Sequence, residues 1–366
     1  MARDSIEVFV FVNSTSETSI SLEIGSHIDD PAVSQTICSF FPSEPRVFGL
    51  DVASLDARSQ FDVTAYRRLY ALLKNEQPDV LHVHPNATGS IARVLGKAAG
   101  VQHIVSTEHN THDDFSHLKN LVNGSTNWLN DVVICNSKTT AASLRTWEQT
   151  LLRWSDTEQT VVYNGVDLDS VRRATADDRR GDLPDGFLIG TAARLVPQKN
   201  LSALIDGARD VIAAHADVHL VIVGDGPKRA SLETLAAERG IEDRVRFLGF
   251  LPKRSDVHAV MKRLDVYAFP SRYEGFGVAV TEAMAAGCPV VVNDIPVLRE
   301  VIGDAGVHVD ANDTAAFAAA LEALYCDDEE RSRLGRRASR RVEREFSIAN
   351  TAREYAKTYR RLAQSR

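Results

Sequence analysis

The sequence predicts an α/β protein with two doubly wound domains, and three observations carry this prediction. Short apolar runs alternate with amphipathic segments of helix length along most of the 366 residues. Runs such as 132–134 are continuously apolar, which is typical of parallel strands covered by helices on both faces. The length also favours two domains, at about 150 residues for each. Strand–helix–strand alternation then indicates right-handed βαβ units in both halves.

The two halves carry similar sets of expected elements. The first half is expected to form strands near residues 6–12, 79–84, 103–107, 131–135 and 160–163, and helices near 61–76, 88–99, 116–130 and 138–151. The second half is expected to form strands near 187–191, 218–223, 244–248, 265–269, 289–292 and 306–309, and helices near 199–214, 227–239, 255–263, 278–286, 296–302 and 312–325. A final segment, 328–364, is predicted to be helical.

The boundary between the domains is predicted from a break in this alternation. Residues 169–186 are charged, hold Gly181, Pro184 and Gly186, and lack an apolar period, so they are interpreted as a linker. The first domain is then 1–168 and the second 187–348. Since ligands of such sheets bind at the carboxyl ends of the strands, a cleft between the domains is the expected site.

Composition and charge exclude several classes of protein. Hydrophobic residues make up 44% and charged residues 25%, which is typical of a globular protein. The formal net charge of −8 argues against a nucleic-acid binder. Residues 331–366 nevertheless hold twelve Arg or Lys against three Glu. We expect a solvated helical face there, with weak peripheral contact to a membrane as the alternative.

The spacing of the cysteines and the hydropathy of the chain predict the cellular compartment of the protein. The four cysteines form no C-x-x-C pair, which predicts a reduced compartment and no structural zinc. No apolar run approaches the ~20 residues that cross a bilayer. The apolar run 6–12 is too short for a signal-peptide core. The expected location is the cytoplasm, with the inner face of the membrane as a peripheral variant.

One loop after a predicted strand, within residues 270–287, carries two glycines and two carboxylates. Gly275 and Gly277 allow backbone amides to approach a ligand closely, and the helix that follows offers its positive end to an anion. Glu274 and Glu282 can accept hydrogen bonds from the hydroxyls of a sugar or a ribose. The alternative is an ordinary strand–turn–helix with a solvated glutamate.

Two further segments follow predicted strands of the second domain. Arg194 and Lys199 lie just past the first of these strands, where a fork-shaped and a point-like cation suit a diphosphate. The alternative for either residue alone is a surface cation. Residues 221–227 lack the third glycine of a dinucleotide fingerprint, so a NAD site is disfavoured, and Gly224 is a candidate for lining the cleft.

Six of the eleven histidines lie between residues 82 and 117. His82 and His84 would share one face of a strand end, and His109 to Asp114 could add ligands, so a metal-dependent hydrolase is one hypothesis. Nothing later in the chain supplies an obvious further set of ligands. A functional role for His109 alone is therefore preferred, without a metal.

Together these segments resemble the retaining family 4 glycosyltransferases (glycosyl transferases group 1), which have the GT-B fold of two Rossmann-like domains facing a cleft. The matching motifs, in family order, are Asn-Gly-Val-Asp at 164–167, Ala-Arg-Leu-x-x-x-Lys-Asn at 193–200, Gly-Asp-Gly-Pro at 224–227, Val-x-Phe-Leu-Gly at 245–249, and Pro-Ser-x-x-Glu-Gly-Phe-Gly with Glu-x7-Glu at 270–282. The resemblance covers most of residues 79–310.

The resemblance implies a nucleoside-diphosphate sugar as donor, held by the second domain, and an acceptor held by the first. Arg194 and Lys199 would then neutralise the leaving diphosphate. Glu282 would bind the ribose, Glu274 the transferred sugar, and His109 would lie beside that sugar. The acceptor would be a hydroxyl of a glycan, a lipid-linked molecule or a small molecule.

The resemblance further implies backbone contacts from the loop, at Gly275, Phe276, Gly277 and Val278. It implies retained anomeric configuration and no obligatory metal or other cofactor. It also implies that residues 349–366 return to pack on the first domain.

One departure from the family pattern keeps alternatives open. The family often has a glycine-rich loop after the first strand, whereas residues 13–24 contain no glycine. A nucleotide-sugar epimerase on the same scaffold and a non-catalytic binder of sugar nucleotides therefore remain alternatives to the transferase.

Overall fold

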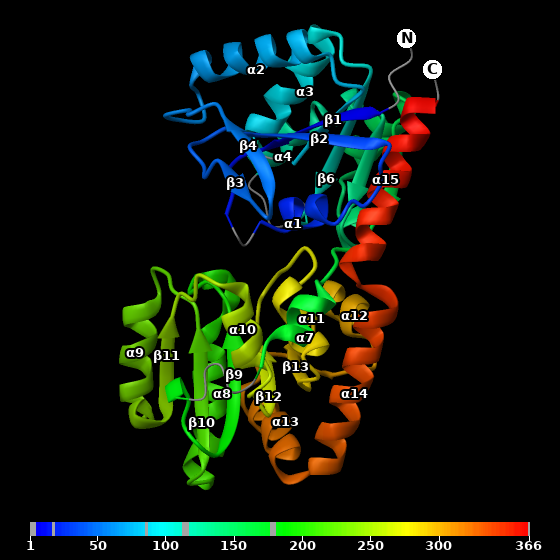
Figure 1. Cartoon of the computed structure of the whole chain (residues 1–366). Coiled ribbons are helices and arrows are strands. Elements are labelled where there is room, and N and C mark those ends of the chain that lie inside the picture. Colours follow the sequence, from blue (N-terminus) through cyan, green and yellow to red (C-terminus); the bar gives the residue numbers. More distant parts are fainter. Residues whose placement is uncertain (1–4, 17–18, 85–86, 112–116, 176–180, 365–366) are drawn as a thin grey trace. The chain divides into compact units, whose positions relative to one another are not determined.

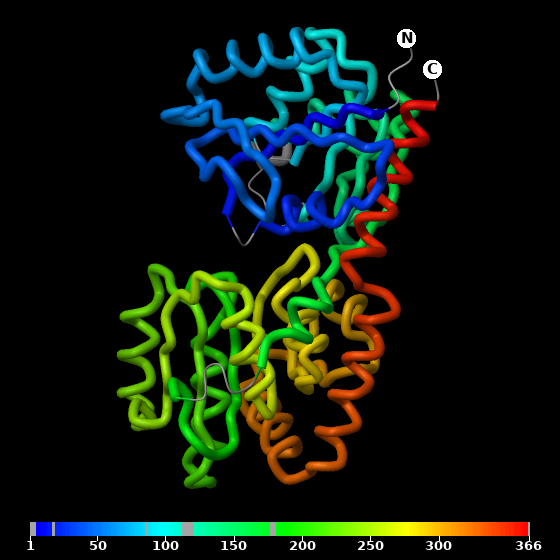
Figure 2. Tube along the Cα trace, in the orientation of Figure 1, coloured from blue at the N-terminus to red at the C-terminus, as the bar shows by residue number. Residues whose placement is uncertain are grey.

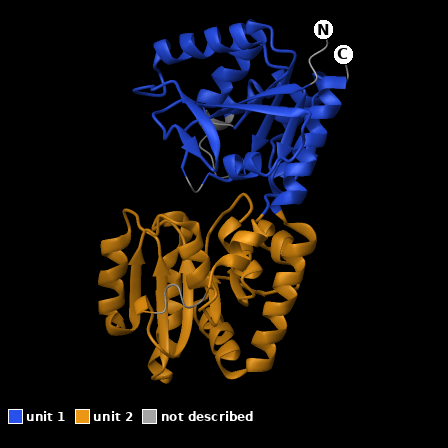
Figure 3. Cartoon of the chain, viewed as in Figure 1, with its two compact units in different colours: residues 1–165, 348–366 blue, residues 166–347 orange. Residues whose placement is uncertain are grey.

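The computed structural model describes residues 5–16, 19–84, 87–111, 117–175 and 181–364 (Figure 1). The chain forms two compact units (Figure 3). Unit 1 comprises residues 1–165 together with 348–366, and unit 2 comprises residues 166–347. Each unit is built around one doubly wound sheet.

Unit 1 holds eight strands and seven α-helices within the described ranges. The strands are β1 (Ile6–Val12), β2 (Val33–Ser39), β3 (Arg46–Val47), β4 (Leu50–Ser54), β5 (Val80–Val83), β6 (His103–Glu108), β7 (Val132–Cys135) and β8 (Glu158–Val161). The helices are α1 (Ile20–Ser26), α2 (Val63–Glu76), α3 (Ala87–Ala99), α4 (His117–Gly124), α5 (Lys138–Ala142), α6 (Thr146–Trp154) and α15 (Ile348–Gln364).

The sheet of unit 1 has the order β3-β4-β2-β1-β5-β6-β7-β8 and is parallel except for the β3–β4 pair. Alternate residues of β1 face opposite sides, so Val10 packs with α1 and α15 while Phe9 packs with α2 and α3. Figure 2 shows α15, in red, beside the strands of unit 1. The order of strands reverses between β1 and β5, and this is the switch point of the sheet.

Unit 2 holds six strands and eight α-helices within the described ranges. The strands are β9 (Phe187–Ala192), β10 (Val218–Val223), β11 (Val245–Gly249), β12 (Val266–Phe269), β13 (Val290–Asn293) and β14 (Val307–Val309). The helices are α7 (Leu168–Arg173), α8 (Leu201–Ala214), α9 (Arg229–Glu238), α10 (Arg254–Met261), α11 (Val278–Ala285), α12 (Pro296–Ile302), α13 (Thr314–Cys326) and α14 (Asp328–Glu345).

The sheet of unit 2 is entirely parallel, in the order β11-β10-β9-β12-β13-β14, and its switch point lies between β9 and β12. One face packs against α8, α9 and α13 through side chains such as Ile189, Leu204 and Phe317. The other face contacts α10, α11 and α14. The strands are covered on both sides, which explains why they are so uniformly apolar.

The change of unit falls between Gly165 and Val166, ahead of the segment 169–186 that sequence analysis interprets as a linker. The first part of that segment is helix α7, because the Asp167 carboxylate accepts hydrogen bonds from the amides of Asp169 and Ser170 and caps it. The chain returns to unit 1 at Ile348, where α15 begins.

Three strands of unit 1 have no counterpart among the predicted ones. These are β2, β3 and β4, and β2 carries Ser34, Gln35 and Thr36 in its first half, so it lacks the apolar run that marks the other strands. The predicted helix 138–151 is two helices, since Glu148 accepts a hydrogen bond from the backbone of Arg145 at 2.8 Å and starts α6 there. No helix in the described ranges is long and apolar enough to cross a membrane.

Candidate functional site

The predicted site residues of unit 2 follow strands that are neighbours in its sheet. Arg194 and Lys199 come after β9, Gly224 after β10, and Glu274 after β12. Because the strands are parallel, their carboxyl ends share one edge, and β9 and β12 flank the switch point. Ligands of doubly wound sheets bind at this place.

Lys199 and Glu274 form an ion pair across the switch point. Only 15% of the Lys199 side chain and 10% of the Glu274 side chain are exposed, so the pair lies largely out of water. The Lys199 ammonium also lies 4.9 Å from the ring centroid of Phe269, at the end of β12. The Ser271 hydroxyl donates a hydrogen bond of 2.6 Å to Glu274 Oε1. Both contacts reach Oε1, and no described residue donates a hydrogen bond to Oε2.

Arg194 differs from Lys199 in its surroundings. Its side chain is exposed, and no described residue forms an ion pair or hydrogen bond with its guanidinium. The loop it belongs to is held in place, since the Leu195 amide donates to the carbonyl of Asp225 at 2.9 Å. Of the two predicted cations, Arg194 therefore keeps an uncompensated charge at the strand edge.

Gly224 joins the loops that follow β9 and β10. Its φ is +121°, and an added Cβ would lie 1.9 Å from the carbonyl oxygen of Ala193. Only glycine fits there. Its own N–H donates to the carbonyl of Gly249 at 2.8 Å, so that amide is already used within the protein.

The loop before α11 and the first residue of this helix supply the other four predicted contact residues. Gly277 has a φ of +92° and precedes Val278, the first residue of α11, whose first amides have no acceptor within the helix. Phe276 is 2% exposed and packs edge-on against Phe346 at 5.3 Å between ring centroids. The Phe276 ring therefore anchors the loop in the core, while Gly277 supplies the left-handed backbone conformation that precedes α11.

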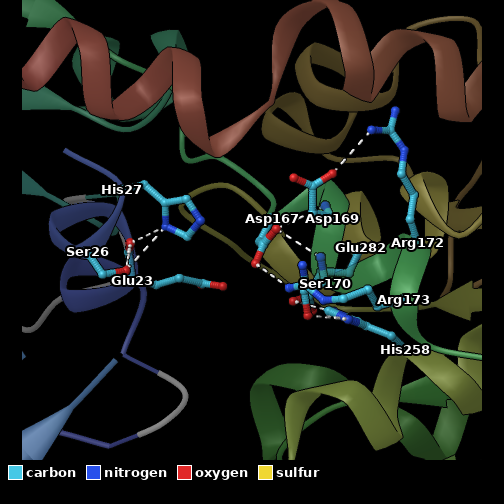
Figure 4. A network of polar contacts seen from close by, with 10 residues as sticks. All are labelled: Glu23, Ser26, His27, Asp167, Asp169, Ser170, Arg172, Arg173, His258 and Glu282. Atoms are coloured by element: carbon cyan, nitrogen blue, oxygen red, sulfur yellow. Dashed lines mark hydrogen bonds and ion pairs between the residues drawn. The ribbon is translucent and has the colours of Figure 1, made fainter. Parts of the chain in front are cut away.

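Glu282 lies one turn into α11 and belongs to a polar network, of which Figure 4 draws Glu282, His258 and Ser170. It pairs with Arg254, the first residue of α10, and His258 Nε2 lies 3.3 Å from its Oε1. His258 Nδ1 in turn lies 3.4 Å from the hydroxyl of Ser170 on α7. We call Glu282, Arg254, His258 and Ser170 the unit 2 network. No local pattern in the sequence marks Arg254, His258 or Ser170 as site residues.

The charge on Glu282 is set by opposing effects. Burial alone would raise the pKa of its carboxyl group, but the charge of Arg254 and the hydrogen bond from His258 lower that pKa to about 2. Both contacts again reach Oε1, and no described residue donates a hydrogen bond to Oε2. A fixed carboxylate with one oxygen available suits a ligand that offers a hydroxyl.

The predicted site residue of unit 1, His109, follows β6. Its Nε2 lies 2.8 Å from Nδ1 of His84, which follows the neighbouring strand β5, and the two rings stack at 5.0 Å. Its Nδ1 is buried and has no partner among the described residues. The contact with His84 thus fixes the ring of His109.

His82 links this pair to the C-terminal helix. Its Nδ1 lies 2.6 Å from the hydroxyl of Tyr359, and its Nε2 lies 2.8 Å from the hydroxyl of Thr107. The Tyr355 hydroxyl lies 3.1 Å from the same Thr107 oxygen. We call His82, His84, Thr107, His109, Tyr355 and Tyr359 the unit 1 network.

The unit 1 network is electrically neutral. Burial, with a smaller effect from His109, lowers the pKa of His82 to about 3, and burial lowers the pKa of His84 far below its usual value. Burial also raises the pKa of Tyr355 to about 12 and raises that of Tyr359 well above its usual value. The imidazoles therefore stay unprotonated and the phenols protonated at neutral pH.

The histidines that motivated a metal site have other partners here. His82 bonds to Tyr359 and Thr107, and His84 bonds to His109. Among the residues whose positions are described, no group of three His, Cys, Asp or Glu could hold a metal ion. His112, Asp113 and Asp114 lie outside the described residues.

Two doubly wound units define the class of this protein. The crystal structure of HepE from Anabaena in complex with UDP and glucose superposes with a TM-score of 0.78, at 20% identity, over 96% of this chain and 99% of that one. The fold is the GT-B fold of glycosyltransferases, which confirms the predicted fold class.

Residues 1–170 match the profile of Glycosyltransferase Family 4, and residues 175–341 match that of Glycosyl transferases group 1. The chain is 33% identical to the phosphatidyl-myo-inositol mannosyltransferase of Mycobacterium leprae over 284 residues, which are 76% of this chain and 72% of the relative. It therefore belongs to the family 4 glycosyltransferases, as the motifs predict.

A second relative matches a smaller share of the chain. The UDP-Gal:alpha-D-GlcNAc-diphosphoundecaprenol alpha-1,3-galactosyltransferase of Escherichia coli is 29% identical over 249 residues, which are 64% of this chain. The chain spans 62% of that enzyme, somewhat less than two thirds of its length.

Proposed function

We propose that this glycosyltransferase moves a hexose from a nucleoside-diphosphate sugar to an acceptor hydroxyl and retains the anomeric configuration. The observation that carries the proposal is the arrangement at the switch point of unit 2. There, Arg194 keeps an uncompensated charge, and Glu274 and Glu282 each have one carboxylate oxygen open to a hydroxyl.

Each residue of unit 2 takes a role that its surroundings suit. Arg194 and Lys199 bind the diphosphate, and the ammonium of Lys199 is shared between the phosphate and Glu274. Glu274 Oε2 accepts a hydrogen bond from the transferred sugar, and Glu282 Oε2 accepts one from the ribose. The amides of Gly277 and Val278 lie near the positive end of α11 and favour negative charge.

The chemistry follows from these charges. The bond between the anomeric carbon and the diphosphate oxygen breaks, and the acceptor oxygen forms a new bond to that carbon on the same face. The acceptor proton passes to the departing diphosphate. Because negative charge grows on the diphosphate as the bond breaks, Arg194 and Lys199 stabilise the transition state more than the bound donor.

In unit 1, we propose that His109 Nδ1 contacts the transferred sugar and that unit 1 binds the acceptor. The two relatives are named for acceptors built on phosphatidyl-myo-inositol and on a diphosphoundecaprenol-linked sugar. A lipid-linked hydroxyl is therefore the first acceptor class to test, before glycans and small molecules.

We further propose that the reaction needs no metal or other cofactor, since two cations of the protein serve the diphosphate. The proposed place of action is the cytoplasm, with peripheral contact at the inner face of the membrane. Turnover that continues in the presence of a chelator such as EDTA would support the proposal that no metal is needed.

The proposal is tested by incubating the protein with UDP- and GDP-hexoses and candidate acceptors, and by assigning the anomeric configuration of the product by NMR. Arg194→Ala and Lys199→Ala should each lower kcat by about 10²–10³-fold, the usual loss when one group that stabilises the transition-state charge is removed. Arg246→Ala removes an exposed charge from β11 and is the matched control.

Other outcomes would favour other functions. Undiminished turnover in the Arg194→Ala, Lys199→Ala double variant would remove these residues from the mechanism. Conversion of the donor sugar without an acceptor would indicate an epimerase. Tight donor binding without turnover over many acceptors would indicate a non-catalytic binder.

A further inference from the structure

One face of α14 in unit 2 carries a dense row of arginines. The six residues, which we call the arginine face, are Arg333, Arg336, Arg337, Arg340, Arg341 and Arg344. They line a cavity of about 480 Å³ beside the turn after α12, where Asp304 is the single carboxylate of the lining. None of these arginines has a place in the proposed transfer reaction.

The row results from the helical period. Positions 333, 336, 337, 340 and 344 recur at three- and four-residue steps, so their side chains leave α14 on one side and span about 16 Å along its axis. The opposite side of α14 is buried through Leu334, Gly335, Ala338 and Val342.

α14 is held firmly against the body of unit 2. An added Cβ at Gly335 would lie 2.2 Å from the carbonyl oxygen of Gly287, so the two backbones touch there. Arg341 donates hydrogen bonds of 2.7 Å and 2.9 Å to the carbonyls of Val301 and Glu300 at the end of α12. The helix cannot turn, and the arginines stay presented on one side.

The charge of this face is only partly compensated. Arg333 pairs with Glu330, Arg337 with Asp304, and Arg344 with Glu345, which also approaches Arg341. Arg336 and Arg340 are exposed, and no described residue pairs with either of them. Six guanidinium groups thus face three carboxylates.

We propose that the arginine face of α14 binds the anionic headgroups of a lipid bilayer. A bilayer offers many phosphates in one plane, so a straight row of guanidinium groups can engage several at once. No exposed large hydrophobic side chain lies on α14, whose residues are all described, so the contact is electrostatic and does not involve insertion. This inference does not depend on the proposed donor or acceptor.

Two other phosphate sources suit the face less well. Single-stranded nucleic acid is held through aromatic stacking as well as charge, and the arginine face contains no aromatic residue. A single free phosphate would engage one or two guanidinium groups and leave most of the row unused. Both remain outcomes of the experiment.

The experiment measures the partitioning of the full chain onto phosphatidylcholine vesicles with and without phosphatidylglycerol, by co-sedimentation at low and high salt. The expected result is binding only to the vesicles that contain phosphatidylglycerol, reversed by salt. Because each arginine near an anionic surface contributes roughly a five-fold gain in partitioning, Arg336→Gln with Arg340→Gln should lower it roughly 25-fold.

The control removes the same charge elsewhere. Arg153→Gln with Arg246→Gln changes two exposed arginines on α6 and β11 and should leave partitioning within about two-fold of the original. Gln and Arg have similar helix propensities, so the changes on α14 and α6 should keep the melting temperature of the original chain. Arg246 is an exposed residue of β11, and its substitution should also have little effect on stability.

Three results would overturn the proposal. The first is no partitioning onto phosphatidylglycerol vesicles at low salt. The second is an equal loss in both double variants, which would indicate general charge and not this face. The third is tighter binding of single-stranded DNA or of inorganic phosphate than of the vesicles, lost in the Arg336→Gln, Arg340→Gln variant, which would assign the face to a soluble phosphate ligand.

Discussion

The two units each bury a polar network near the carboxyl ends of their strands, but the networks differ in charge. The unit 1 network consists of neutral imidazoles and hydroxyls, including His82 bonded to Tyr359 and Thr107. The unit 2 network is centred on the ion pair of Glu282 with Arg254, and His258 and Ser170 extend it. The comparison teaches that burial selects the neutral form unless a nearby opposite charge outweighs it, as Arg254 does for Glu282 but Glu108 does not for His109.

The largest expected difference between the two networks is in how their contributions to stability respond to acid. The pKa values of His82 and His84 lie far below their usual value of 6.5 in the folded state, so below pH 6.5 the unfolded chain takes up protons that the folded chain does not. The contribution of these two histidines to the free energy of unfolding is fully present above pH 6.5. As the pH falls toward 4, the effect of each histidine should lower this free energy by about 1.4 kcal/mol per pH unit. Urea unfolding of unit 1 between pH 6.5 and 4.5 measures this slope.

The His84→Gln variant should reduce that slope by about 1.4 kcal/mol per pH unit. Unit 2 serves as the internal reference, since the pKa of Glu282 is lowered to about 2 and its contribution is lost only as the pH falls from about 4.5 toward 2. Equal slopes for His84→Gln and the original chain would show that the imidazoles are not the cause.

Removing one ion should cost more in unit 2 than removing one hydroxyl in unit 1. Arg254→Ala leaves the Glu282 carboxylate buried beside His258 alone, which should destabilise unit 2 by about 3–5 kcal/mol. Adding Glu282→Gln should recover a large part of this loss because the unpaired charge is gone. Calorimetric melting of both variants measures the effect, and an additive loss in the double variant would contradict it.

Tyr359→Phe probes the neutral network. It leaves His82 Nδ1 without its partner and should destabilise unit 1 by about 1–3 kcal/mol. Tyr325→Phe is the matched control, since its hydroxyl bonds to Asp217 at 3.0 Å in an exposed position and should matter by less than about 0.5 kcal/mol. Similar losses of stability in both variants would show that the buried hydrogen bond of Tyr359 contributes no more than the exposed one of Tyr325.

The smallest effect is expected at the rim of the unit 2 network. Ser170→Ala removes the 3.4 Å contact with His258 Nδ1, which is at the outer limit of a hydrogen bond. The expected loss is about 0.5 kcal/mol or less in urea unfolding. A loss comparable to that of Arg254→Ala would mean that Ser170 controls the orientation of His258.

The parallel strands and the motif residues were open to prediction because their signals are local. Apolar runs such as 218–223 become β10 without a change of bounds, and Arg194, Lys199 and Glu274 follow their strands at short distances along the chain. The three strands at one side of the unit 1 sheet, β2, β3 and β4, lack such a signal, and β2 mixes polar and apolar residues.

The partners of the site residues could not be predicted because packing brings them together from distant positions. Arg254 and His258 reach Glu282 across the contact of α10 with α11, over 28 and 24 positions. The Tyr359 hydroxyl reaches His82 over 277 positions. A pair of histidines spaced for one strand face therefore suggested a metal, when each ring instead has a partner within the protein.

The return of α15 to unit 1 has a consequence for the order of folding during synthesis. One face of the unit 1 sheet, which includes Val8 and Val10, is covered by α15, whose residues are translated after the whole of unit 2. Unit 2 can fold before α15 has been synthesised. Until then, the strands of unit 1 expose an apolar face that can aggregate. A fragment ending at Gly165 should therefore be poorly soluble, and co-expression with residues 348–366 should restore it.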